Sequence, residues 1–182
     1  MKNGFTFVEL VVTLGISTLA LVGLVNLFLI FNSVYGYQQV LLATAGSAGA
    51  AMSTIEDSVL PASRVLASHM FSGTTYTSGT STLILELPAV DSSGNIVSDT
   101  KDYVAFSSST TMLYRLTQAS INSVRISGLK QLSGTLQSII FTYNDNDFTK
   151  VTQVTVDLQT QAQFKEQTAQ SILHEQMRLR NL

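Results

Sequence analysis

A long apolar segment with one carboxylate inside it constrains this chain more than any other feature. The segment runs from Phe5 to Phe31, 27 residues inclusive, and Glu9 is its only charged residue. As an α-helix it is about 40 Å long, which exceeds the ~30 Å hydrocarbon core of a bilayer. The segment therefore predicts a membrane-spanning helix in which Glu9 lies near the interface or has a partner.

A cleaved secretory signal is the alternative explanation of an apolar N-terminal segment. The apolar region of such a signal normally spans about 7–15 residues before a small-residue cleavage site. Here the apolar residues continue well past Thr18-Leu19-Ala20, the nearest approximation to such a site. Lys2 precedes the segment, and the next Lys or Arg is Arg64. The positive-inside rule then predicts an N-terminus in the cytoplasm and the rest of the chain outside.

The apolar pattern continues beyond the membrane segment along one side of the same helix. Its members are Val34, Tyr37, Leu41, Ala45, Ala48, Met52, Ile55 and Val59. A stripe with this spacing is typical of an amphipathic helix that packs on a folded domain. Pro61 is expected to end the helix, while the glycines at positions 36, 46 and 49 weaken the expectation of continuity.

Short β-like segments separated by turns occupy the rest of the chain. The candidate strands are Thr82–Leu87, Lys101–Ser107, Thr111–Leu116, Leu136–Tyr143, Val151–Leu158 and Ile172–Leu179. Val154, Val156 and Leu158 alternate with polar residues, which is typical of a strand with one covered face. We therefore expect an α+β fold in which a long helix lies across an antiparallel sheet. The expected parts are a membrane half (5–31), an amphipathic half (32–66) and an extracytoplasmic β-sheet domain (67–182).

Charge and composition narrow the function classes. The formal net charge is −2, so the chain has no basic surface that would indicate nucleic-acid binding. It contains no cysteine, which excludes disulfides, thiol nucleophiles and cysteine metal sites. Ser, His and Asp occur without a nucleophile-elbow motif. We expect neither enzymatic activity nor a cofactor.

One acidic cluster offers oxygen atoms of the kind that calcium prefers. It comprises Asn144, Asp145, Asn146 and Asp147. The EF-hand spacing and its distant bidentate glutamate are absent, and Asn and Asp clusters form turns in the first instance. We favour a turn and keep Asn144, Asp145 and Asp147 as weak candidates for metal ligands.

Residues 2–10, KNGFTFVEL, together with the apolar helix that follows, resemble the N-terminal signal of type IV prepilins and type II secretion pseudopilins. The resemblance implies that a prepilin peptidase removes residues 1–4 as a leader, cuts between Gly4 and Phe5, and methylates the new terminus at Phe5. It also implies that Glu9, the fifth residue of the mature chain, acts in filament assembly. A pilin-like fold, with a long helix on an antiparallel sheet, follows from the same resemblance.

The β-like segments LILELPA, DYVAF and LQSIIFTYNDND and the terminal RLRN resemble those of W-type minor pilins and J-type minor pseudopilins. Two departures are Asn26, where the family often has a proline, and the missing cysteine pair. The implied function is a minor structural subunit of a pilus-like or pseudopilus filament. The precursor would be in the inner membrane and the mature chain in an extracytoplasmic or cell-surface filament.

The implied partners are other pilin or pseudopilin subunits, the prepilin peptidase, an inner-membrane assembly platform and membrane lipid. Three alternatives stay open. Two lie within the filament class: a major shaft pilin and a DNA-uptake pilin. The third is a membrane-anchored extracellular domain that binds a ligand.

Overall fold

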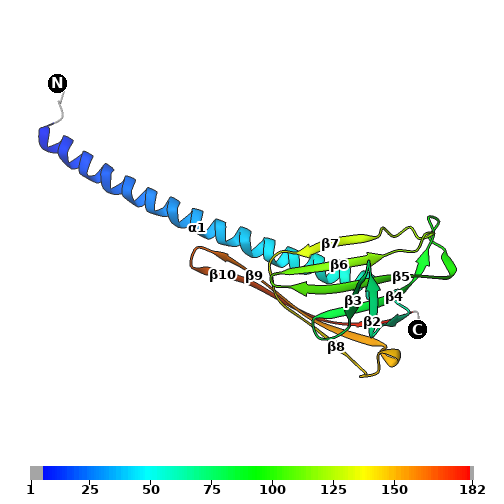
Figure 1. Cartoon of the computed structure of the whole chain (residues 1–182). Coiled ribbons are helices and arrows are strands. Elements are labelled where there is room, and N and C mark those ends of the chain that lie inside the picture. Colours follow the sequence, from blue (N-terminus) through cyan, green and yellow to red (C-terminus); the bar gives the residue numbers. More distant parts are fainter. Residues whose placement is uncertain (1–5, 181–182) are drawn as a thin grey trace.

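The computed structural model describes residues 6–180, which form one long helix and a β domain packed on its second half. Helix α1 (Phe7–Val59) has 53 residues and no interruption. Figure 1 shows its N-terminal half projecting away from the strands, while its C-terminal half lies against them. Alanine, the best helix former, recurs in this second half, and Ala48 and Ala51 are buried against the strands.

The β domain contains ten strands and one short 3-10 helix, η1 (Phe148–Lys150), within the described residues. The strands are β1 (Arg64–Val65), β2 (Ser68–Phe71), β3 (Thr74–Thr77), β4 (Thr82–Val90), β5 (Ile96–Ser109), β6 (Met112–Gln118), β7 (Gly128–Ser133), β8 (Leu136–Tyr143), β9 (Gln153–Phe164) and β10 (Gln167–Arg178). All their pairings are antiparallel.

The strands are arranged in three sheets. The largest has the order β1-β4-β5-β6-β7, the second has the order β10-β9-β8, and β2 and β3 form a separate hairpin. Helix α1 packs mainly on β9 and β10 and also contacts β7 and β4. One continuous core forms between them, in which Ile55 of the helix and Phe106, Phe141 and Leu158 of the strands are almost fully buried.

The structure confirms the α+β class, the long helix and its end before Pro61. The expected strands are all present, although most are longer than predicted, and β5 and β6 are joined by only two residues, Thr110 and Thr111. The prediction of a single sheet was wrong, because the strands form three separate sheets. The amphipathic half does not reach residue 66, since the helix ends at Val59 and residues 64–65 already pair with β4.

The helical stripe is correct only in its second half. Met52, Ile55 and Val59 are buried, as their spacing predicted. Leu41 and Ala45, however, are exposed, and the side facing the strands instead carries Val40, which is half-buried, and Thr44, which is buried. Thr44 can face the domain because its hydroxyl donates to the Val40 carbonyl and its own carbonyl accepts from Thr160.

Candidate functional site

The projecting half of α1 is a long exposed apolar surface within the described residues. Every residue from 7 to 31 is exposed, including Phe28 and Phe31, each with more than two-thirds of its surface accessible. Soluble monomers rarely expose a continuous apolar surface of this kind, so it needs a cover. The segment is long and apolar enough to span a membrane.

Glu9 lies in the first turn of this helix and closes a capping box with Thr6. The Thr6 hydroxyl oxygen accepts from the Glu9 backbone N–H, and the Glu9 carboxylate accepts from the Thr6 backbone N–H, each at 3.4 Å. The carboxylate therefore points back toward the N-terminal end of its own helix, where the helix dipole favours negative charge.

The predicted site residues divide between described and undescribed parts of the chain. Gly4 and Phe5, the predicted processing site, lie outside the described residues. Glu9 is exposed and lies among apolar side chains that are exposed as well. Sequence reasoning missed Thr6 as its partner, although Thr6-Phe7-Val8-Glu9 has the spacing of a capping box.

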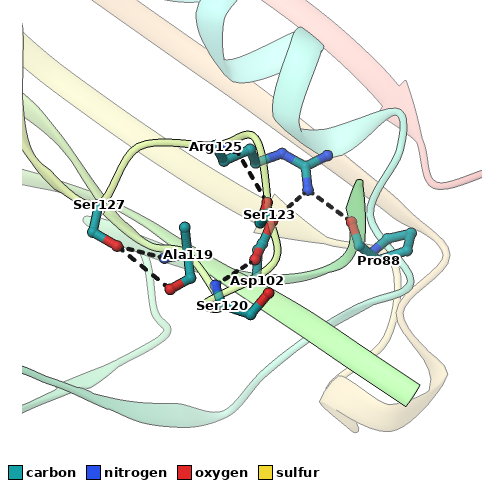
Figure 2. A network of polar contacts seen from close by, with 7 residues as sticks. All are labelled: Pro88, Asp102, Ala119, Ser120, Ser123, Arg125 and Ser127. Atoms are coloured by element: carbon teal, nitrogen blue, oxygen red, sulfur yellow. Dashed lines mark hydrogen bonds and ion pairs between the residues drawn. The ribbon is translucent and has the colours of Figure 1, made fainter. Parts of the chain in front are cut away.

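A buried ion pair fixes the loop between β6 and β7 (Figure 2). The carboxylate of Asp102, which is fully buried, accepts from Arg125 Nη1 at 2.7 Å, from the Ser123 hydroxyl at 2.6 Å and from the Ser120 backbone N–H at 2.8 Å. The same nitrogen of Arg125 donates to the Pro88 carbonyl at 2.7 Å. The network thus ties residues 120–125 to β4 and β5.

The network also decides the charge state of Asp102. Burial by itself would raise the pKa of this carboxyl, but the hydrogen bonds from Ser123, Ser120 and Arg125 outweigh it, and the pKa is lowered. Asp102 is therefore ionised at neutral pH and forms a paired buried charge. Nothing in the sequence indicated that Asp102 would pair with Arg125, which follows it by 23 residues.

The acidic cluster forms a turn between β8 and η1. The Asn144 side-chain oxygen accepts from the backbone N–H groups of Thr152 and Gln153, each at 3.0 Å. The Asp145 carboxylate accepts from the Asp147 N–H at 2.8 Å. All of these bonds are local and hold the chain between β8 and β9.

Asp147 completes this turn by capping η1. Its carboxylate accepts from the Thr149 hydroxyl and N–H and pairs with Lys150, contacts that lower the pKa of Asp147 to about 2. Among residues 6–180 no group of three His, Cys, Asp or Glu side chains is arranged to hold a metal ion. The oxygen atoms of Asn144, Asp145 and Asp147 are instead used for hydrogen bonds within the turn.

Comparison of the chain with family models, curated proteins and solved structures finds no match.

Proposed function

We propose that the chain is a structural subunit of a type IV pilus-like or pseudopilus filament, made as a single-pass membrane precursor. The observation that carries the proposal is the projecting half of α1, an exposed apolar helix that continues without a break into a helix buried in a β domain. The exposed apolar side chains of such a helix can be buried first by lipid, in the precursor, and then by the helices of neighbouring subunits, in a filament. The leader-like residues 1–4 and Glu9 support the same proposal.

Glu9 has a specific task in this proposal. Apolar helices in contact have little hydrophobic reason to prefer one axial stagger, because their association depends on van der Waals packing. Cleavage after Gly4 creates a positively charged α-amino group at Phe5, four residues before Glu9 in the sequence. Opposite charges ~4 Å apart attract by about 4 kcal/mol at an effective dielectric of ~20. A pair between the amino group of one subunit and Glu9 of its neighbour would therefore set the stagger.

The capping box gives a further reason for Glu9 to lie in the first turn of the helix. Because the carboxylate points toward the helix N-terminus, it is directed to the region where the new amino group would be created. We propose that the bond to Thr6 holds the side chain in the membrane precursor and that the neighbouring amino group replaces or joins it in the filament.

The subunit is proposed to be minor, as in W-type minor pilins or J-type minor pseudopilins, with the assembly platform and the prepilin peptidase as its partners. A major shaft pilin and a DNA-uptake pilin are the alternatives within the filament class. An extracellular ligand-binding domain on a membrane anchor is the alternative outside it, and such an anchor has no use for cleavage between Gly4 and Phe5.

Processing tests the proposal directly. Intact-mass analysis of the chain extracted from membranes, with and without a co-expressed prepilin peptidase, should show loss of residues 1–4 and one added methyl group only when the peptidase is present. Replacing Gly4 by Leu should block the cut, because a residue without Cβ lets the backbone enter a tight site. Retention of Met1 in the presence of the peptidase, or a cut near Ala20, would contradict the proposal.

A further inference from the structure

The tip of the β9–β10 hairpin lies beside the place where α1 changes from apolar to polar. Figure 1 shows this hairpin reaching farther toward the N-terminal end of α1 than the other described strands. Its turn is formed by Lys165 and Glu166, between Phe164 and Gln167. The Lys165 ammonium donates to the Ser33 hydroxyl at 3.5 Å.

A missing side chain on the helix lets the hairpin tip approach closely. The ring of Phe164 lies against the backbone of α1 at Gly36, where a Cβ atom would overlap it. At the next residue of the helix, the Tyr37 hydroxyl donates to the Thr168 carbonyl of β10 at 3.4 Å. The tip therefore rests on α1 through a ring contact and two hydrogen bonds, and its height along the helix is defined.

That height corresponds to the surface of a bilayer. The last residue of the apolar segment is Phe31, and Ser33 lies two residues later, about 3 Å along the axis. The headgroup layer adds roughly 5–8 Å beyond the hydrocarbon core on each side of a bilayer. When α1 spans the membrane, Ser33 and the hairpin tip beside it lie within that layer.

The side chains of the tip suit this layer. Phe164 is half-buried, and the Lys165 ammonium lies 5.5 Å from the centre of its ring. Lys165 and Glu166 are both exposed, and together with Ser33 and Phe164 they line a recess of about 310 Å³. A phospholipid such as phosphatidylcholine carries one phosphate and one ammonium group, which complement this pair of opposite charges.

We propose that the β9–β10 tip is a second membrane contact, in which Lys165 binds a lipid phosphate, Glu166 faces the headgroup ammonium, and Phe164 lies at the hydrocarbon boundary. The contact would fix the depth and rotation of the β domain above the membrane before assembly. The inference rests on the membrane-spanning precursor of the proposed function.

Fluorescence quenching in vesicles tests the proposal, and the absence of native cysteine allows a label at one position at a time. The full chain is reconstituted at high dilution into phosphatidylcholine vesicles with an environment-sensitive dye on Gln167→Cys, an exposed position next to the turn that leaves Lys165 and Glu166 in place. Matched samples carry the dye on Leu19→Cys, in the apolar segment, or on Asn146→Cys, in the turn beside η1. Spin-labelled lipids quench from either the headgroup or the acyl-chain centre.

The headgroup quencher should remove most of the emission at position 167 and leave position 146 unchanged, while the acyl-chain quencher acts at position 19. Lys165→Glu should restore much of the emission of the tip label. If positions 167 and 146 are quenched equally and weakly while position 19 is quenched by the acyl-chain probe, the inference is overturned and the proposed function stays intact. An unquenched position 19 would overturn both. Quenching at position 167 that disappears on further dilution would assign the tip to a second copy of the chain and overturn the lipid contact.

Discussion

At Gly36, helix propensity favours a residue with a Cβ atom, whereas packing against the hairpin tip favours glycine. In a helix interior, glycine is less favourable than alanine by about 1 kcal/mol. Here it is retained where the Phe164 ring lies on the helix backbone, whereas Gly46 and Gly49 have no neighbouring atom that an added Cβ would meet. The three glycines, which weakened the prediction of a continuous helix to the same degree, therefore have different roles.

Gly36→Ala should displace the Phe164 ring, because the ring is the movable partner in the overlap. We expect faster hydrogen exchange in residues 161–170 with little change in melting temperature. Gly46→Ala is the matched control and should stabilise the helix by up to about 1 kcal/mol without affecting the hairpin. Equal exchange rates in the two variants would show that the tip does not depend on Gly36.

Because of Asp102, the β domain should become less stable as the pH falls. Its pKa is lower in the folded chain than in the unfolded chain, so the unfolded state binds more protons as the pH falls. The stabilisation is present above the unfolded pKa of about 3.9 and is lost as the pH falls through the folded value. Asp102→Asn should lower stability at pH 7, toward the lower end of ~3–5 kcal/mol because Arg125 stays partly hydrated.

Urea unfolding between pH 7 and pH 2.5 measures this dependence. Below pH 4, the free energy of unfolding should change less with pH in Asp102→Asn than in the wild-type chain. Asp99→Asn, at an exposed position of the same strand, is the control and should keep the wild-type slope. If both variants keep it, the acid dependence comes from other carboxylates.

At the scale of elements, the sequence was sufficient where burial repeats with a regular period. Val154, Val156 and Leu158 are buried in β9, and Met52 and Ile55 are buried in α1, because alternation and helical spacing report the face that is covered. The pattern was insufficient where polar groups are buried with partners. Thr44 is buried because Thr160 donates to its carbonyl, and no periodicity of apolar residues indicates such a contact.

The elements that sequence reasoning missed have a similar explanation. The first four residues of β7 (Gly128–Ser133) are exposed, and β2 and β3 form a short hairpin with few buried side chains. These strands depend on backbone pairing with neighbours and so lack the apolar alternation that marks a covered strand. The Asp102–Arg125 pair was missed because it is a long-range contact of two isolated charges.

Ile55→Asp tests how α1 is seated on the strands. Ile55 is fully buried, so an unpaired carboxylate there should destabilise the β domain by more than about 4 kcal/mol. Ala45→Asp is the control, because Ala45 belongs to the same predicted stripe but is exposed. Thermal melting of the detergent-solubilised chain should show a large loss for the first variant and almost none for the second. Similar losses would mean that the predicted stripe, with Ala45 inward, describes the packing better.

At the scale of the whole molecule, the two halves of one helix lie in different environments. Its first half is apolar and exposed throughout, and its second half is part of the core of a β domain. From Leu10 to Ile55 the chain carries no charged residue, so Glu9 is the only charged residue of α1 within its projecting half, residues 7–31. We therefore expect Glu9 to set how neighbouring helices are aligned.

Capping and pairing make different predictions for Glu9, and three variants separate them. Glu9→Gln keeps a side-chain oxygen for the capping box but removes the charge, and Glu9→Ala removes both. Thr6→Ala weakens the cap and keeps the charge. All three should insert into the membrane and be cleaved, since the apolar segment and the Gly4–Phe5 junction are unchanged.

Immunoblotting of sheared filaments from cells that express each variant measures incorporation. We predict that Glu9→Gln and Glu9→Ala are both processed but absent from filaments, whereas Thr6→Ala is incorporated at close to the wild-type level. Normal incorporation of Glu9→Gln would contradict the charge pairing and would leave Glu9 as the cap of its own helix.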